Sequence, residues 1–203
     1  IGIGNYAFYE CTGLNSISFG NGIKVIGNYS FAGCGSLRDV AIPDLCSLGQ
    51  IGDHAFYSCT NLTKFTLPIN VSYVGDYAFA ECRFLSDFVM CNYGDANDRS
   101  NLTELGWNVF ENCETLSSLT FPANYNEAVD ISLVKGCKNL RYITARSKKM
   151  TFTEKINGEV YCFDCFKEML SGDPVNGTFY FEGRDDSTLH TFTRDNCFAF
   201  SYI

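Results

Sequence analysis

The sequence is poor in positive charge and contains no cluster of Lys and Arg. Its 15 Lys and Arg face 23 Asp and Glu over 203 residues, so the formal net charge is −8. Nucleic acids and anionic membranes attract proteins through basic patches, so this composition argues against both as partners. The sequence also lacks an apolar run of the roughly 20 residues that a membrane-spanning helix needs. We therefore expect no nucleic-acid binding and no membrane insertion.

Histidine is scarce, and no catalytic motif stands out. Only His54 and His190 are present. An enzyme needs a nucleophile with a base and an orienting group, or paired carboxylates, brought together in a pocket. Nothing in the sequence assembles such a set, so we predict no catalytic residues. A hydrolytic or redox enzyme is the hypothesis with the least support. His54 aligns with Tyr6, Tyr29 and Tyr77 of other copies of the repeat described next, which indicates a variable polar position.

The sequence contains one pattern written six times, with Phe, Cys and Leu at fixed offsets and Gly near the start of most copies. The copies are Ile3–Phe19, Ile26–Pro43, Ile51–Pro68, Val74–Met90, Leu105–Pro122 and the less regular Val129–Ala145. Their cysteines, Cys11, Cys34, Cys59, Cys82, Cys113 and Cys137, are separated by 23, 25, 23, 31 and 24 residues. A period in this range is typical of a leucine-rich solenoid.

Each copy predicts one strand and one bend. In the third copy Leu62, Phe65 and Leu67 point inward, while Lys64 and Thr66 point outward, because successive side chains of a strand alternate between faces. Ala55, Phe56 and Cys59 would form a turn or short helix on the far side. One copy is too small to bury its own apolar residues, so the copies must stack and share a core. The fold class is therefore an α/β solenoid, a right-handed superhelix with parallel strands, short helices or turns, and a β-α-β cap.

Eleven cysteines would suggest a disulfide framework in a secreted chain, but six of them are explained by the repeat. Stacked strands lie about 4.8 Å apart, whereas the Cβ atoms of a disulfide lie about 3.8 Å apart on converging vectors. A free cysteine also packs well as a small apolar residue. We expect the six repeat cysteines to form a ladder of buried free thiols.

The repeat predicts a single solenoid domain over residues 1–203. Regular repeats cover 3–146, a degenerate last repeat covers 147–176, and a terminal cap covers 177–203. Alternating residues 178–181, a helix start at Asp186-Ser187 and a closing strand at 198–203 predict strand, helix and strand for the cap. Such an element covers the last open layer of a solenoid.

The longest interval between cysteines, 31 residues, contains an insertion at Cys91–Ser100. Its Gly, Asn and Asp residues predict a surface loop. The loop lacks the ligand spacing of a known calcium loop, so a solvated insertion is the better reading. Insertions in solenoids gather on one face and often contact partners. The loop residues that we name as binding candidates are Asp95, Asn97, Asp98 and Arg99.

A Cys-x-x-Cys motif in the degenerate repeat raises the question of a metal. Cys162 and Cys165, with His190 and Cys197, supply the ligand types of a zinc site. The second pair does not have zinc-site spacing, and Cys197 ends the predicted cap helix. No thioredoxin-like unit surrounds the motif. We expect no metal and no cofactor, and the two cysteines are either buried thiols or one local disulfide.

The pattern I-G-x-x-A-F-x-x-C-x-x-L-x-x-I-x-L-P resembles the BspA-type leucine-rich repeat family of surface proteins over residues 3–145. The segment 177–203 also resembles the terminator of many such proteins, with Cys197 where Gly is usual. The resemblance implies a bacterial, cell-surface or secreted protein, without catalytic residues, that adheres to host proteins such as fibronectin or to other microbes. The chain opens inside a repeat, so we read it as a mature or trimmed fragment, and the lack of a signal peptide says nothing about export.

Outward strand residues stack into two columns that form the predicted binding surface. The candidates are Asp39, Lys64, Thr66, Asp87, Ser118, Thr120, Tyr142 and Thr144. Such short polar groups suit an extended polypeptide or a flat protein surface better than a buried metabolite. The expected partner is a protein, from the extracellular matrix of a host or from another surface, and the expected state is a monomer. The alternative is a rigid spacer or display stalk in a larger surface protein.

Overall fold

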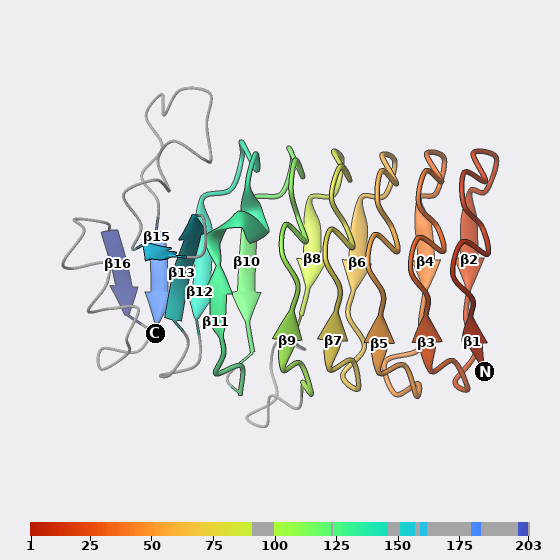
Figure 1. The fold of residues 1–203 in the computed structure, drawn as a ribbon, viewed down its shortest axis with the longest axis horizontal. Helices are drawn as coiled ribbons and strands as arrows, with labels where there is room; N and C mark the ends of the chain where they lie inside the picture. The colour runs from red at the N-terminus through yellow and green to blue at the C-terminus, as the bar shows by residue number, and fades with distance from the viewer. Residues whose placement is uncertain are drawn as a thin grey trace.

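The computed structural model describes residues 1–90, 100–122, 124–145, 151–156, 159–161, 180–183 and 199–202. Successive repeats stack along one long axis, so that strands of the same kind follow one another in rows (Figure 1). One row, which we call the sheet face, contains β2 (Ser16–Ser18), β4 (Asp39–Ala41), β6 (Lys64–Thr66), β8 (Asp87–Val89), β10 (Ser118–Phe121) and β12 (Tyr142–Ala145). The predicted leucine-rich solenoid with parallel strands is confirmed.

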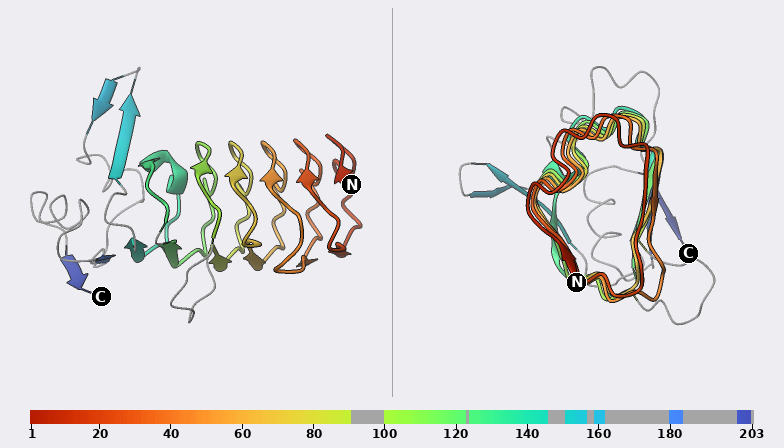
Figure 2. Two further views of the ribbon diagram at one scale, coloured as in Figure 1. Left: turned by 90° about the horizontal axis from the view of Figure 1, so that it is seen from below. Right: turned by 90° about the vertical axis from the view of Figure 1, so that its right-hand side faces the viewer.

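A second row of strands runs along the solenoid and was not predicted. It consists of β1 (Gly2–Ile3), β3 (Val25–Ile26), β5 (Gln50–Ile51), β7 (Tyr73–Val74) and β9 (Glu104–Leu105), paired in parallel in that order. We call it the short-strand sheet. Seen along the axis, the turns superimpose as a flattened coil (Figure 2). Each of these strands has two residues, which is too short to show an alternating pattern.

The C-terminal part adds further strands to the stack. The elements are β11 (Ala128–Asp130), the 3-10 helix η1 (Ile131–Val134), β13 (Thr151–Ile156), β14 (Glu159–Tyr161), β15 (Tyr180–Gly183) and β16 (Ala199–Tyr202). β15 pairs in parallel with β12 and with β16, and β13 lies between β11 and the antiparallel β14. The helix predicted for the cap lies outside the described residues, as does most of the predicted degenerate repeat, so both stay predictions.

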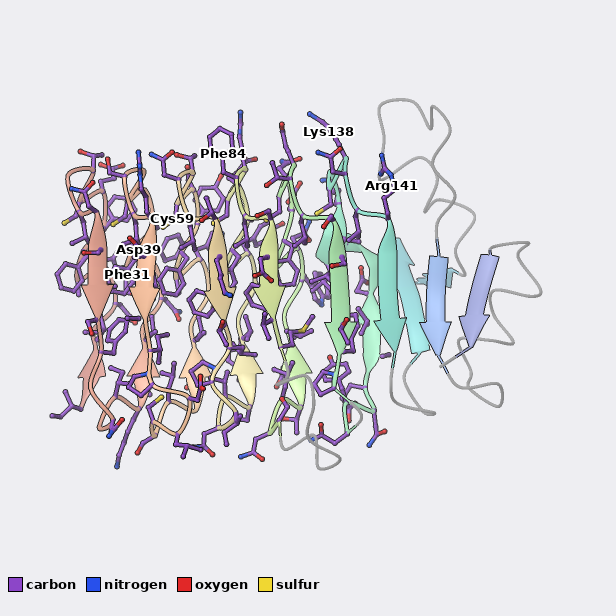
Figure 3. All side chains as sticks on the ribbon, turned by 180° about the vertical axis from the view of Figure 1, so that it is seen from behind. Phe31, Asp39, Cys59, Phe84, Lys138 and Arg141 are labelled. Carbon is purple, nitrogen blue, oxygen red and sulfur yellow. The ribbon has the colours of Figure 1, made fainter. Side chains whose placement is uncertain are left out.

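The core is built from columns of identical residues. Rings of Phe31, Phe56 and Phe79 stack along the axis, with centroids 5.2 Å apart at each step. The predicted inward residues Leu62, Phe65 and Leu67 are buried, while Lys64 is exposed and Thr66 half-buried. Figure 3 shows that the side chains follow the stacked turns along the solenoid, with Phe31 and Cys59 among those labelled. The alternation predicted for this strand is therefore confirmed.

The cysteine ladder is also present, with one correction. Cys34, Cys59, Cys82, Cys113 and Cys137 are free and buried. Each thiol donates a hydrogen bond of 3.0–3.2 Å to a phenylalanine carbonyl of the preceding turn. Burial raises the pKa of Cys82 and Cys137 to about 12, which keeps them protonated. Cys11 is exposed, contrary to prediction, and it lies in the first of the described turns, at the end of the stack.

On the far side of the solenoid, the described residues of the first five repeats have hydrogen-bonded turns and no short helices. Two positions per turn have positive φ: Tyr6 and Glu10 in the first, His54 and Ser58 in the third. Left-handed residues interrupt a right-handed helix, so no helix can extend through these bends. The sixth turn has η1 instead, capped by the side chain of Asp130.

A ladder of Asn and Asp side chains ties these bends together. Asn28 accepts a hydrogen bond from the backbone N–H of Asp53 at 3.0 Å, and Asp76 accepts one from Trp107 at 2.8 Å. The glycine before each of these residues packs against the side chain of the previous turn. A Cβ on Gly27 would lie 2.6 Å from the Oδ1 of Asn5, so glycine is required by this close approach.

Candidate functional site

The sheet face places the predicted outward residues in register. Ser16 lies opposite Asp39, Lys64 opposite Asp87, and Ser118 opposite Tyr142. Asp39, Lys64, Asp87 and Ser118 are exposed. The ammonium of Lys64 lies 3.4 Å from the carboxylate of Asp87, and both side chains are more than half exposed, so this pair contributes only about 0–1 kcal/mol. Alternation along the strands thus places varied side chains at corresponding outward positions of successive turns.

Some of the predicted site residues do not share this exposure. Thr120 is 8% exposed, so its place in an open binding column is wrong. Its short side chain lies on β10, which is flanked by β12 on one side and β8 on the other. Tyr142 and Thr144 lie on the predicted strand, β12, and the structure describes their backbone but not their side chains. The insertion residues Asp95, Asn97, Asp98 and Arg99 also lie outside the described residues.

The sheet face is interrupted between β4 and β6. β2 pairs with β4, β6 with β8 and β10 with β12, but β4 and β6 do not pair, and neither do β8 and β10. Few Cα atoms of β4 and β6 come within 8 Å of each other, whereas those of paired strands do so along the whole strand. On the short-strand sheet the same two turns remain paired through β3 and β5. The second repeat has two more residues than the first, in the segment after Pro43, and the opening lies beside that segment.

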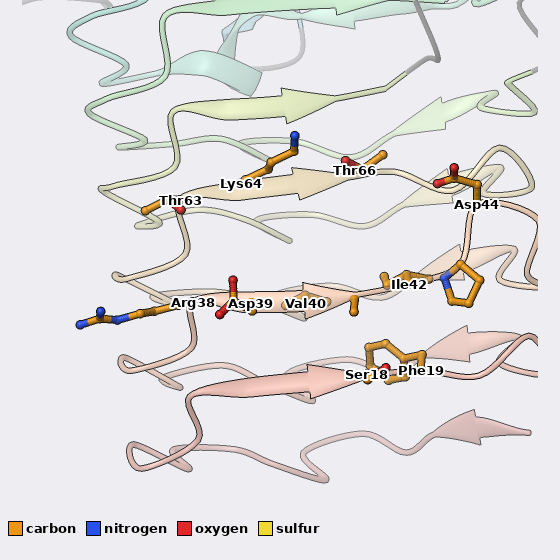
Figure 4. A pocket seen from close by; sticks show the side chains of 12 residues that line it. Ser18, Phe19, Arg38, Asp39, Val40, Ile42, Asp44, Thr63, Lys64 and Thr66 are labelled. Atoms are coloured by element: carbon orange, nitrogen blue, oxygen red, sulfur yellow. The ribbon is translucent and has the colours of Figure 1, made fainter.

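A groove of about 710 Å³ occupies this opening. Phe19, Val40 and Ile42 supply apolar surface, and Arg38, Asp39, Asp44, Lys64 and Thr66 supply polar groups. Figure 4 shows Arg38 and Asp44 toward opposite ends of the groove, which is lined by residues of β4 and β6 and by Ser18 and Phe19 at the end of β2. The volume lies within the range of about 300–1,000 Å³ that is usual for ligand pockets. This groove was not predicted, because nothing in the repeat pattern signals a missing strand pair.

An aromatic column, also missed, runs along the bends of the first four turns. The rings of Tyr6, Tyr29, His54 and Tyr77 stack with centroids 4.4–4.9 Å apart. Burial in this stack lowers the pKa of His54, while the carboxylates of Asp53 and Asp76 act in the opposite direction. His54 therefore belongs to a packed column and not to a freely variable surface position. The signal was present, since aromatic rings recur at this offset in the first four copies.

The described residues offer little for covalent chemistry. No group of three or more His, Cys, Asp and Glu in that part of the chain is placed to hold a metal ion. Cys162, Cys165, His190 and Cys197 lie outside it, so the expected absence of a metal stays a prediction. Among the described residues, no helix has the length and apolar character needed to cross a bilayer. What these surfaces provide is contact area, hydrogen-bonding groups and charge.

The comparison with known families decides what the repeat is. The model of the BspA type leucine-rich repeat region matches in six copies, over residues 1–96 and 86–167. The chain belongs to this family. Leucine-rich repeat families are generally non-catalytic, and their solenoids serve as extended binding surfaces.

Solved structures with the same repeat agree with the fold. A leucine-rich repeat protein of T. pallidum, TpLRR, is 28% identical, with a TM-score of 0.66 over 75% of this chain and 66% of that one. A leucine-rich repeat protein of Bacteroides ovatus is 18% identical, with a TM-score of 0.51 over 90% of this chain and 58% of that one, and shows the fold alone. The BspA-type chain thus spans somewhat less than two-thirds of the length of these proteins. No curated protein matches its sequence.

Proposed function

We propose that this BspA-type chain is a non-catalytic protein-interaction module, displayed on or secreted from a bacterial cell, and that its partner contacts the sheet face. One observation carries the proposal. Asp39, Lys64, Asp87 and Ser118 occupy corresponding outward positions on successive sheet-face strands, and all four are exposed and chemically different. The inward positions beside them carry similar apolar residues, because packing restricts those positions.

Variation on the outside of a rigid repeat is what a recognition surface needs. The scaffold holds each strand residue in place, and the outward side chain then decides which partner is bound. Adhesion to a host matrix protein or to another surface protein is the finer form of the proposal, and it follows from the family resemblance. The rigid-spacer alternative differs in one respect: it predicts that the sheet face can be altered without consequence.

A binding experiment with a matched control separates these readings. Fibronectin and other extracellular-matrix proteins are immobilised, and the purified chain is applied by biolayer interferometry. The test variant is Lys64→Ala with Asp87→Ala, which removes the exposed ion pair of the sheet face. The control is Lys24→Ala with Gln50→Ala, which removes exposed side chains at or beside the short-strand sheet.

We expect the sheet-face variant to bind at least about tenfold more weakly, because charged side chains complementary to a partner speed its association and fix its register. The control should bind like the unaltered chain. Both should keep their melting temperature, since exposed substitutions usually change stability by less than about 0.5 kcal/mol. Equal binding by all three proteins would place the binding site outside the sheet face and overturn that part of the proposal, whereas binding to none of the panel would favour the spacer.

A further inference from the structure

The interruption between β4 and β6 leaves two facing strands without partners on their inner edges. In a parallel ladder, the backbone groups of alternate residues point to opposite neighbours. Phe19 donates its N–H to the carbonyl of Ala41, so the backbone groups of Ala41 point toward β2. The backbone groups of Val40, the preceding residue, therefore point toward β6. The same alternation directs the backbone groups of Lys64 and Thr66 toward β4, because Leu67 is bonded to β8 through Val89.

These inward-directed groups have no hydrogen-bond partner within the described residues. The N–H and C=O groups of Val40, Lys64 and Thr66 make none of the backbone or side-chain bonds found there, and β4 and β6 have no ladder between them. A polar backbone group gains stability from a partner, and an open strand edge readily pairs with another strand. The two sides of the groove are therefore complementary to an extended backbone.

The floor of the groove exposes side chains that are buried elsewhere. Val40 and Ile42 occupy the inward positions that Phe65 and Leu67 occupy in the next turn, yet they are only partly buried, whereas Phe65 and Leu67 are 1% and 4% exposed. An extended segment that enters the groove would place alternate side chains over this apolar floor and the others toward solvent. The floor thus favours a segment with apolar residues at every second position.

The ends of the groove carry opposite charges. Arg38 precedes β4 and Asp44 follows it, both are exposed, and neither has an ion-pair partner in the part of the chain that the structure describes. Lys64, by contrast, is directed to Asp87 on the far side of β6. A peptide segment about as long as the groove therefore matches these charges best if it has one acidic end and one basic end. This arrangement selects a zwitterionic peptide over one with two like charges.

From these four observations we infer that the groove between β4 and β6 binds an extended polypeptide segment as an added strand. Neighbouring strands lie about 4.8 Å apart, so an added strand needs about twice that distance between its two partners. β4 and β6 have few Cα atoms within 8 Å of each other, so they are further apart than paired strands. The segment has alternating apolar residues and oppositely charged ends. The inference rests on the proposed function, because it names the partner chemistry and the binding mode of one part of the sheet face.

Strand addition explains the groove better than a compact metabolite does. Recognition of this kind takes its affinity from main-chain hydrogen bonds and its specificity from alternate side chains. The groove is open along one face, and its charged groups Arg38 and Asp44 lie toward opposite ends, so they do not converge on one small molecule. A second copy of this chain is the competing occupant, and the experiment below separates it from a peptide.

The probe is a set of fluorescent, terminally blocked hexapeptides. The reference peptide is Glu-Val-Thr-Val-Thr-Lys, and its matched control has the same sequence with both valine amides N-methylated. Fluorescence polarisation measures binding, and amide hydrogen exchange followed by NMR reports where the peptide lies. We expect the N-methylated peptide to bind at least about tenfold more weakly, because it loses two strand hydrogen bonds. The amide protons of Val40, Lys64 and Thr66 should exchange more slowly when the reference peptide is bound.

Two variants test the charged ends in a way that does not depend on the direction of the peptide. Asp44→Lys makes both ends of the groove basic, so the preference should change from the Glu/Lys peptide to the same peptide with Glu at both ends. Glu127→Lys makes the same change of charge at an exposed residue outside the groove and should leave the preference unchanged. Both positions are exposed, and the exchange measurement on the unaltered chain does not depend on either variant.

The inference is wrong if the N-methylated peptide binds as well as the reference peptide, or if the three amides exchange equally fast with and without peptide. Protection of these amides at high protein concentration without peptide, together with a dimer in sedimentation, would assign the groove to a second copy and would also overturn it. If the peptide does not bind but a matrix protein does, the inference about the groove fails, and the sheet-face proposal is still decided by its own binding experiment. Conversely, peptide binding that protects the amides stands even if no matrix protein binds the sheet face.

Discussion

The carboxylate of Asp53 accepts a hydrogen bond of 3.1 Å from the backbone N–H of Asp76, one full turn further along the chain. Asn5 and Asn28 make the corresponding bonds at 2.8 and 3.0 Å. The side chain of each turn thus satisfies a backbone donor of the next, at the bend where no strand pairing is available. This ladder, together with the thiol and phenylalanine columns, holds the turns in register.

Loss of one ladder acceptor should destabilise the solenoid. Asp53→Ala leaves the N–H of Asp76 without its acceptor and also removes the partner of the Tyr73 hydroxyl, which donates to Asp53 at 3.2 Å. We expect the free energy of unfolding to fall by about 1–3 kcal/mol, measured by urea denaturation. Asp53→Asn keeps the acceptor, as Asn28 does in the turn before, and should cost much less. Equal losses for both variants would show that the hydrogen bond is not the source of the stability.

The glycines before the ladder residues Asn28, Asp53 and Asp76 should tolerate no side chain. A Cβ on Gly52 would lie 2.8 Å from the backbone nitrogen of Asn28, whereas a Cβ on Gly49 meets nothing within 4 Å. Gly52→Ala is therefore expected to lower the free energy of unfolding by about 1–3 kcal/mol through overpacking. Gly49→Ala, three residues away, should leave it nearly unchanged. Thermal and urea unfolding of the pair check this, and similar stability for the two variants would contradict the close approach.

The stacked His54 should make stability depend on pH. Burial between Tyr29 and Tyr77 lowers its pKa from the usual 6.5, so protons bind more readily to the unfolded chain. The free energy of unfolding contributed by this residue is then fully present above pH 6.5 and is lost as the pH falls through the lowered pKa. His54→Tyr places in this turn the ring that neighbouring turns carry, and it should lose less stability between pH 7 and 5. An equal pH dependence for both proteins would exclude His54 as its source.

The thiols should separate into two classes. Cys34, Cys59, Cys82, Cys113 and Cys137 are buried and protonated, so they should resist alkylation until the chain unfolds. Cys11 is exposed and should react in the native state. Iodoacetamide labelling followed by peptide mass spectrometry distinguishes each site. Labelling of the buried group at the rate of Cys11, or a disulfide between consecutive members of the ladder, would contradict this account.

Much of the fold could be predicted from the sequence, because each repeat has the same apolar and polar residues at the same offsets. The alternation around Phe65 set the inward and outward faces of β6, and the cysteine offset placed Cys59 and Cys82 in one buried column. The short-strand sheet was missed because two residues such as Val25 and Ile26 carry no detectable period. Of the predicted sheet-face residues, Asp39, Lys64 and Asp87 are exposed in register, while Thr120 is buried, and the role of this face in binding stays a prediction.

By itself, the sequence determined the family, the stacking of turns, the apolar core and the row of varied residues on the sheet face, since each depends on a pattern within one repeat or on its period. Only the tertiary structure decided where neighbouring turns touch and where they part. The aromatic column joins residues 23–25 positions apart, such as Tyr29 and His54, and the groove exists because β4 and β6 separate while β3 and β5 stay paired. Both features depend on distances between turns, and the spacing of turns is set by packing of the whole solenoid, which no single repeat encodes.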